Sequence, residues 1–149
     1  MKLVVDLSLT KLMRISVPRG DVYHGLKASD PSFQGFGELY FSRIDYQEIK
    51  GWEKHKRLTL NLMVPAGEVR FVVFASDALS GKPTELCGDY RLGADVNHQR
   101  LTVPAGMWVA FQGCSSTINI VANVIPEEHD PAEADNLELS QVPFDWSGA

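Results

Sequence analysis

Polar side chains able to carry proton-transfer chemistry recur at every second position of one short segment. If this segment is an extended strand, one face carries Glu53, His55, Arg57, Thr59 and Asn61. Residues two apart on a strand have Cβ atoms about 6–7 Å apart, so Glu53 and His55 could share a proton or a ligand. An imidazole titrates at about pH 6.5, whereas a carboxylate reaches that range only when burial raises its pKa. The row predicts either a water-facing strand or the lining of a polar pocket.

The opposite face of the same segment leaves both interpretations open. Leu58, Leu60 and Leu62 alternate with the polar row, as expected for a strand with one buried and one solvated face. However, Lys54 and Lys56 share the face of the leucines. The run of about 12 residues also exceeds the usual strand of roughly 5–6. A long bent strand at the opening of a barrel would account for both observations.

Basic and amide side chains near this row predict contacts with an anionic ligand. Lys50 and Arg57 could hold a phosphate. Thr59 or Asn61 could donate a hydrogen bond to a developing oxyanion. Arg43 follows the sequence YFS and could face a diphosphate, with an exposed arginine at a strand end as the alternative.

Two further candidate ligand contacts lie in residues 107–112. Trp108 could stack on a nucleobase, as aromatic faces do, or pack in the core beside Met107 and Phe111. Gln112 shares the parity of Trp108, so both would project from one face of a strand. Gln112 could therefore hydrogen-bond the ligand on which Trp108 stacks.

Composition limits the classes of partner. A chain of 149 residues fits one domain, which we expect to span residues 1–149. A net charge of −5 argues against a nucleic-acid binder that works by overall charge, because counterion release needs clustered Lys and Arg. The N-terminus has no secretory signal and no stretch is long enough to cross a bilayer. Cys87 and Cys114 form no close Cys-x-x-Cys pair, which excludes a zinc ribbon or a thioredoxin-like motif. The expected location is by default the reducing cytoplasm, with both cysteines free.

Short apolar or alternating runs separated by turn residues dominate the chain, and helix signals are scarce. About ten predicted strands imply an all-β fold, either a β-sandwich or a closed barrel. The tetrapeptide VPAG at 64–67 and 103–106 predicts two similar turns. Residues 132–139 could form a helical turn, and Phe144 and Trp146 are expected to dock on the body of the fold.

Motifs spread along the chain resemble one known family. In order they are GFGELYFS, IKGWEKHKRLTLNL, VPAGEVRFVVF, LTVPAGMWVAFQG, and EEHDP followed by VPFDW. Residues 20–146 thereby resemble the dTDP-4-dehydrorhamnose 3,5-epimerase family, most closely its short sugar-nucleotide epimerase-like branch. The resemblance implies a cupin-type jelly roll, a double-stranded β-helix, that forms a homodimer with an N-terminal strand crossing to the partner. It also implies action on nucleotide-linked 4-keto sugars without a metal or other cofactor.

The same resemblance implies roles for individual residues. In the family, a His directly after the KGW turn removes a proton beside the C4 carbonyl, and that position here is Glu53. A Tyr on a late strand returns a proton to the opposite face of the enolate. That Tyr would fall near Ala122, in a strand that contains none. Lys50 retains a basic residue that contacts substrate, and His55 matches the second His of a His-x-His pair in related keto-isomerases.

A catalytic metal is not predicted. Metal enzymes of the cupin type carry a His-x-His pair, then a Pro-x-Gly turn, then a third His, and this chain resembles that pattern in part. Here Glu53 and His55 stand in for the pair, but Val109 occupies the position of the third His. Two candidate ligands without a third make a poor transition-metal site. The remaining histidines are expected to be structural or solvated: His24, His98 and His129.

Three functions therefore stay open. The chain could be an enzyme that uses Glu53 or His55 as the base, and that epimerises C3 or C5 or shifts the ketone between C4 and C3. It could instead be a non-catalytic sugar-nucleotide-binding protein with a degenerate active site, or a structural jelly-roll dimer. The enzyme is favoured because polar residues persist along the predicted lining: Glu53, His55, Arg57 and Asn61.

Overall fold

The computed structural model describes residues 5–148, which form strands and short 3-10 turns. The strands are β1 (Ser8–Lys11), β2 (Arg14–Ile15), β3 (Val22–Tyr23), β4 (Glu38–Arg43), β5 (Ile49–His55), β6 (Leu60–Ala66), β7 (Val69–Ser76), β8 (Pro83–Leu92), β9 (Gln99–Val103), β10 (Trp108–Gly113), β11 (Ile120–Ile125) and β12 (Ala134–Asn136). The 3-10 turns η1 (Pro131–Glu133) and η2 (Leu139–Gln141) flank β12. No helix within residues 5–148 is long and apolar enough to span a membrane.

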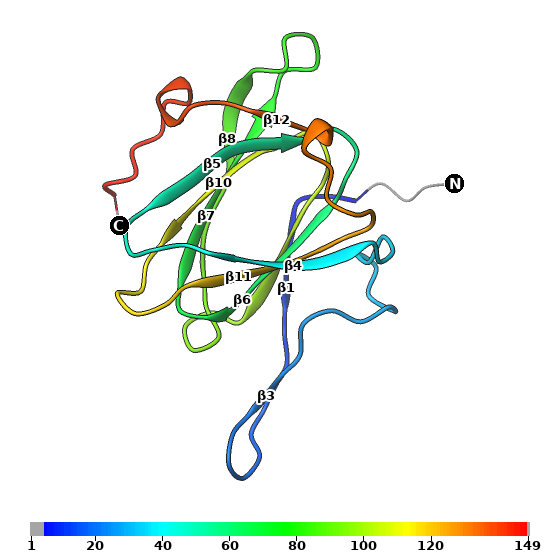
Figure 1. Ribbon diagram of the computed structural model, residues 1–149, viewed down its shortest axis with the longest axis vertical. Coiled ribbons are helices and arrows are strands. Elements are labelled where there is room, and N and C mark those ends of the chain that lie inside the picture. The colour runs from blue at the N-terminus through cyan, green and yellow to red at the C-terminus, as the bar shows by residue number, and fades with distance from the viewer. Residues whose placement is uncertain (1–4, 149) are drawn as a thin grey trace.

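Ten of these strands form two antiparallel sheets that face each other (Figure 1). The first sheet has the order β1-β9-β6-β11-β4, and the second has the order β12-β5-β10-β7-β8. Buried apolar side chains of both sheets meet between them, among them Leu62, Val103 and Val121 of the first and Phe71, Val73 and Val109 of the second. This arrangement confirms the predicted all-β jelly roll.

The second sheet is buried on both faces. Its outer face carries Trp52, Phe74 and Trp108, and the C-terminal segment covers them with Phe144 and Trp146. Burial on both faces explains why β7 reads as a nearly continuous apolar run rather than an alternating one. The predicted docking of Phe144 and Trp146 is confirmed.

The segment that carries the polar row is not one long bent strand, so that prediction was wrong. β5 ends at His55 in the second sheet, and β6 begins at Leu60 in the first. Residues 56–59 cross between the sheets, and the alternation of side chains restarts after the crossing. Residues that share parity along the sequence therefore belong to two different walls of the fold.

Two local predictions have different outcomes. The VPAG turns are similar, since Gly67 and Gly106 both adopt left-handed backbone conformations with φ of 80° and 89°. The predicted helical turn over residues 132–139 is wrong, because η1 is followed by strand β12 before η2 begins.

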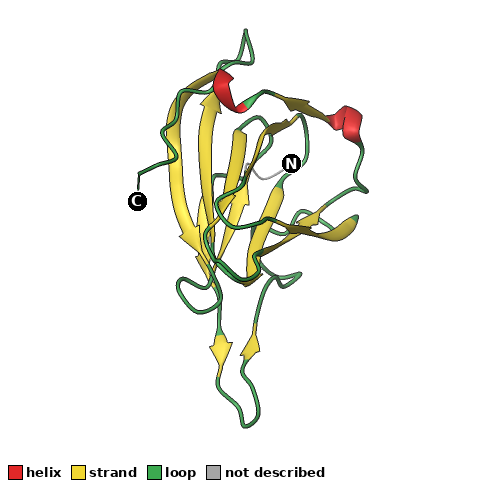
Figure 2. Ribbon diagram, turned by 60° about the vertical axis from the view of Figure 1, so that its left-hand side comes forward, coloured by secondary structure: helices red, strands yellow, loops and turns green. Residues whose placement is uncertain are grey.

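The hairpin β2–β3 forms an arm, residues 12–24, that projects away from the two sheets (Figure 2). Arg14 ties its base to the β8–β9 loop by hydrogen bonds to the carbonyl of Ala94 and the carboxylate of Asp95. The arm nevertheless exposes several large apolar side chains: Met13, Ile15, Val17, Val22 and Tyr23. A two-stranded hairpin of this kind is marginally stable without packing against other elements.

The buried side chain of Asn119 hydrogen-bonds the backbone of three loop segments of the jelly roll. Its Oδ1 accepts hydrogen bonds from the N–H groups of Glu68 and Ser115, each at 3.0 Å. Its Nδ2 donates to the carbonyls of Ile44 and Ser115 at 3.1 and 2.9 Å. The side chain itself is fully buried, so its loss would leave these backbone groups without their protein partner in a largely buried site.

We expect Asn119→Ala to lower the free energy of unfolding by roughly 3–5 kcal/mol, because several buried backbone groups lose their partner. Chemical denaturation measures the change. Asn136→Ala is the matched control, since Asn136 is exposed on β12, and its effect should stay within about 0.5 kcal/mol. Equal losses in the two variants would contradict the role given to Asn119.

Candidate active site

A cavity of about 270 Å³ lies between the two sheets. Its floor is apolar and includes Leu60 and Leu62 of β6 and Val109 and Phe111 of β10. Its polar lining comes from both walls: Tyr40, Lys50, Glu53, His55, Asn123 and His129. A concave, mostly apolar space with a few convergent polar groups is the usual form of a small-molecule site.

The backbone of β5 aims Lys50 and Glu53 at the cavity. Glu53 pairs with Val109 and Lys50 pairs with Phe111, so two residues of β5 oppose the single Ala110 of β10. This bulge resets the alternation and brings residues three apart onto one face. The bulge needs Gly51, whose φ is 146° and whose added Cβ would lie 2.4 Å from the Cβ of Ala110.

An imidazole held between two carboxylates is the central feature of the cavity. The Nε2 atom of His55 lies 3.0 Å from Oε1 of Glu53, and its Nδ1 lies 2.6 Å from Oε2 of Glu133. Glu53 is 42% exposed, whereas Glu133 is fully buried. Glu53 therefore presents its carboxylate to the cavity, and Glu133 supports the imidazole from behind.

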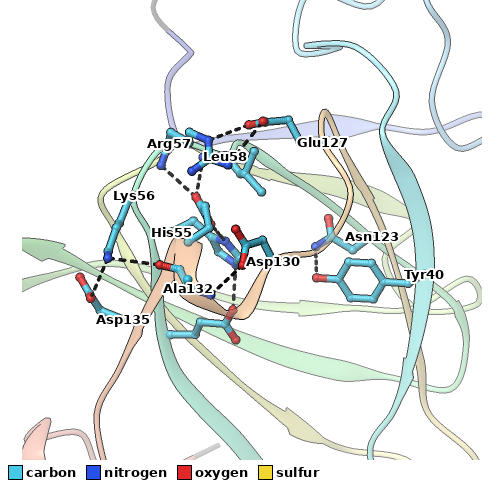
Figure 3. Close-up of polar contacts among 12 residues, drawn as sticks. Tyr40, His55, Lys56, Arg57, Leu58, Asn123, Glu127, Asp130, Ala132 and Asp135 are labelled. Atoms are coloured by element: carbon cyan, nitrogen blue, oxygen red, sulfur yellow. Dashed lines mark hydrogen bonds and ion pairs between the residues drawn. The ribbon is translucent and has the colours of Figure 1, made fainter.

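Glu133 reaches this position through the 3-10 turn η1. The Asp130 side chain caps the turn by accepting a hydrogen bond from the N–H of Ala132. Oε1 of Glu133 then accepts hydrogen bonds from the N–H groups of Arg57 and Leu58, at 2.9 and 3.0 Å. Figure 3 shows these contacts beside His55. One carboxylate thus fixes both the crossing between the sheets and the orientation of the imidazole.

These contacts shift the pKa values of all three groups toward their charged forms. Burial alone would lower the pKa of His55, but the hydrogen bonds with Glu53 and Glu133 outweigh it, and the pKa is raised. The hydrogen bond from His55 lowers the pKa of Glu53, against a partial burial that would raise it. Burial likewise opposes the charge of Glu133, yet the backbone donors and the imidazole lower its pKa. Since ionised carboxylates only accept hydrogen bonds, both ring nitrogens of His55 donate in this geometry, and the group is a carboxylate–imidazolium–carboxylate with one net negative charge.

The opposite wall carries a phenol. Tyr40 of β4 and Asn123 of β11 are neighbours across the first sheet. Nδ2 of Asn123 donates a hydrogen bond to Oη of Tyr40 at 3.0 Å, which Figure 3 shows on the far side of the site from His55. The ring of His129 packs 5.9 Å from the ring of Tyr40. Burial raises the pKa of Tyr40, so its phenol is neutral at physiological pH.

The basic residues predicted to bind substrate occupy different places. Lys50 lines the cavity and donates from Nζ to the carbonyl of Arg43 at 2.5 Å. The Arg43 side chain is exposed at the end of β4 and lies 3.6 Å from Asp45. Arg57 lies outside the cavity and pairs with Glu127 at 2.8 Å.

Asn61, Trp108 and Gln112 also lie outside the cavity. Asn61 is buried on the other face of β6, where it hydrogen-bonds Thr102 and the carbonyl of Ser32. In β10 the residues that face the cavity are Val109 and Phe111, so Trp108 and Gln112 project from the opposite face. Trp108 packs in the apolar cluster of that face, and Gln112 donates to the carbonyl of Gln47. Of the predicted contacts, the cavity thus brings together Lys50, Glu53 and His55.

Sequence reasoning missed Glu133, Tyr40, Asn123 and His129. Asp130 and Pro131 signalled a turn, but nothing in the sequence indicated that the next acid returns to β5. In β4 the apolar residues Leu39 and Phe41 are exposed, and Tyr40 faces inward. Tyr40 shares a face of β4 with the polar residues Glu38 and Ser42, and this was the available sign that it lines the site.

Metal ligands would have to come from the histidines and acids of the chain. Within residues 5–148, no group of three or more His, Cys, Asp and Glu side chains is placed to hold a metal ion. His98 has a structural contact, since its Nε2 lies 3.0 Å from the carbonyl of His24. Metal independence stays a prediction. His129, which was expected to be structural or solvated, lines the cavity.

Comparison with known proteins gave structural matches. No protein-family profile matches this chain, and no curated protein matches it. A dTDP sugar isomerase from Desulfovibrio desulfuricans is 30% identical, with a TM-score of 0.86 over 96% of this chain and 92% of that chain.

Two more distant structures share the fold. The dTDP-6-deoxy-D-glucose-3,5-epimerase RmlC from Legionella pneumophila, in complex with dTDP-4-keto-L-rhamnose, is 18% identical, with a TM-score of 0.78 over 97% of this chain and 80% of that chain. The sugar 3,4-ketoisomerase QdtA from Thermoanaerobacterium thermosaccharolyticum, in complex with TDP, is 16% identical, with a TM-score of 0.71 over 89% of each chain. At these identities the two matches support the fold alone.

The charge of His55 gives a pH-dependent prediction. We expect Glu133→Gln to lower the pKa of His55, because one of its two carboxylate partners is lost. In the wild type the folded pKa exceeds the unfolded one, so protonation of His55 stabilises the fold fully below about pH 6.5. This contribution disappears as the pH rises through the folded pKa.

Titration of the imidazole C–H resonances by NMR measures the pKa, with His55→Gln used to assign the signal. Glu127→Gln is the control, since Glu127 pairs with Arg57 and does not contact the imidazole. A His55 pKa that is unchanged by Glu133→Gln would contradict the proposed pairing of the imidazole with Glu133.

Proposed function

The chain belongs to the dTDP-4-dehydrorhamnose 3,5-epimerase family, and from this membership we propose that it acts on a nucleotide-linked 4-keto sugar by forming an enolate. Epimerisation at C3 or C5 and migration of the ketone between C4 and C3 both begin with loss of a proton beside the carbonyl. The observation that carries the proposal is the carboxylate of Glu53, which faces the cavity between the sheets and is paired with the imidazole of His55.

Glu53 is the base in this proposal. Both ring nitrogens of His55 face carboxylate oxygens and donate to them, so the imidazolium has no lone pair with which to accept a proton. Its charge keeps Glu53 ionised at neutral pH. A bound sugar would exclude water from Glu53 and raise its pKa toward the operating pH, which strengthens it as a base.

Lys50 supplies positive charge to the same reaction. Its side chain lines the cavity from β5, three residues before Glu53. From there it can stabilise the oxyanion of an enolate or hold the diphosphate of the substrate. Arg43, whose carbonyl accepts a hydrogen bond from Lys50, extends this basic region to the surface. The step moves only a proton, so the proposal needs no metal or redox cofactor.

Deuterium exchange tests this proposal. The protein is incubated in deuterated water with a panel of nucleotide-linked 4-keto-6-deoxy sugars, and NMR follows exchange at C3 and C5. We expect exchange in the wild type and a loss of about 100-fold or more in Glu53→Gln, because the proton acceptor is removed. Glu85→Gln, at an exposed position of β8, should behave as the wild type.

Other results would point to other functions. Exchange that survives in Glu53→Gln but disappears in His55→Gln would make His55 the base. Binding of the sugar nucleotides without exchange would support the non-catalytic binding protein. Neither binding nor exchange would contradict both.

We also propose that the protein is a homodimer in which the arm packs on a second copy. The arm exposes its apolar side chains to solvent, and Met13 is 59% exposed. The body of the fold exposes a further apolar surface at Phe36, Leu39 and Phe41, beside the free edge of the first sheet. Two apolar surfaces of this kind on one chain support association between copies.

We place this protein, with residues 1–149 as one cupin-like unit, in the cytoplasm, where its two cysteines would stay free.

Sedimentation or light scattering tests the dimer. We expect the wild type to be dimeric and the double variant Ile15→Asp, Val22→Asp to be monomeric, because two charges would be buried in the interface. Leu79→Asp is the control, since Leu79 is 99% exposed on the β7–β8 loop, away from the arm. A monomeric wild type, or a dimer that persists in the double variant, would rule out the arm as the interface.

A further inference from the structure

Inversion of a carbon centre needs acid and base on opposite sides of the sugar. A base that removes a proton and returns it to the same face restores the original configuration. A second group must therefore deliver a proton to the other face of the enolate. In this cavity Glu53 belongs to the second sheet, so a donor on the first sheet would face the opposite side of a bound sugar.

Tyr40 is the titratable side chain that β4 of the first sheet places in the cavity. Within β4, Glu38, Tyr40 and Ser42 share the inward parity, and Leu39 and Phe41 are exposed. Tyr40 packs partly against the core and lines the same cavity as Glu53. The two groups therefore face one space from opposite walls.

The contacts of Asn123 determine how the phenol donates. The backbone N–H of Asn61 can only donate a hydrogen bond, and it donates to Oδ1 of Asn123 at 3.1 Å. The Nδ2 of Asn123 must then face Tyr40, to whose oxygen it donates. Because the phenol oxygen accepts this bond, its own hydrogen is left to point elsewhere. The cavity is where a bound substrate could receive it.

The surrounding charges keep the phenol protonated until it reacts. Burial and the negative charges of Glu53, Glu38 and Glu133 disfavour a phenolate. The hydrogen bond from Asn123 acts in the opposite sense, because it stabilises the phenolate that forms when the proton leaves. Tyr40 is therefore neutral before the reaction, and the amide of Asn123 is placed to stabilise the phenolate that forms.

We propose that Tyr40 is the acid that delivers a proton to the enolate from the face opposite Glu53, with Asn123 as its positioning residue. This assignment rests on the proposed function and specifies its outcome as epimerisation. Tyr40 of β4 would thereby take the role of the tyrosine that is absent from β11.

Each proton has a source and a destination in this step. Glu53 takes the proton from the carbon beside the carbonyl, and the electrons of that C–H bond form the enolate. The O–H bond of Tyr40 then breaks as a new C–H bond forms on the opposite face. The resulting phenolate regains a proton from water, and Glu53 releases its proton to water. The reaction involves no net oxidation or reduction.

The test separates proton removal from proton delivery. Wild type and Tyr40→Phe are each incubated in deuterated water with the 4-keto sugar nucleotides that the wild type accepts, and NMR follows both recovered substrate and epimer. We expect Tyr40→Phe to form epimer about 100-fold more slowly or less, while deuterium still enters the substrate with its configuration retained. Retained exchange also shows that the variant is folded and binds substrate. Tyr90→Phe is the matched control, because Tyr90 lies on β8 and pairs with Phe71 of β7.

Each result decides for or against Tyr40. Epimer formed by Tyr40→Phe at the wild-type rate would overturn its role and leave the proposed function intact. Loss of exchange together with epimer would also overturn it, since Tyr40 would then act in proton removal or in the fold. No exchange in the wild type would overturn the proposed function and this assignment with it.

Discussion

The carboxylate of Glu133 is the group on which the site depends. One oxygen binds the N–H groups of Arg57 and Leu58 where the chain crosses between the sheets, and the other binds His55. A buried carboxylate is stable only when it is paired and hydrogen-bonded, and these contacts provide both. Because the same group fixes the crossing and the imidazole, it also determines where His55 holds the carboxylate of Glu53.

The jelly roll gives the two walls of the cavity different chemistry. The second sheet contributes a charged cluster, in which an imidazolium holds a carboxylate ionised. The first sheet contributes a neutral phenol oriented by an amide. Since the sheets face each other across an apolar floor, a planar enolate held between them would meet a base on one side and an acid on the other. Separation of the two groups by the fold is what allows proton removal and delivery to differ in direction.

Parity arguments succeeded within single strands and failed wherever the strand changed. Glu53 and His55 do share a face, because both lie in β5. Asn61 has the same parity but belongs to β6, on the other side of the crossing, and its side chain is buried away from the cavity. Trp108 and Gln112 were correctly predicted to share a face, but alternation alone cannot tell which face of β10 meets the cavity. That choice depends on which residues the partner strands and the C-terminal segment cover.

The sequence by itself determined the all-β class, the family and the presence of an acid–imidazole pair at Glu53 and His55, because each strand pattern and each motif consists of residues that are close along the chain. Only the tertiary structure decided that Glu133 returns to His55 across 78 positions, and that Tyr40 and Asn123 meet on the opposite wall across 83. Such contacts arise from the pairing of distant strands, which no local periodicity encodes. The charge state of His55 was likewise undetermined until both of its partners were in place, because a pKa responds to neighbours in space rather than in sequence.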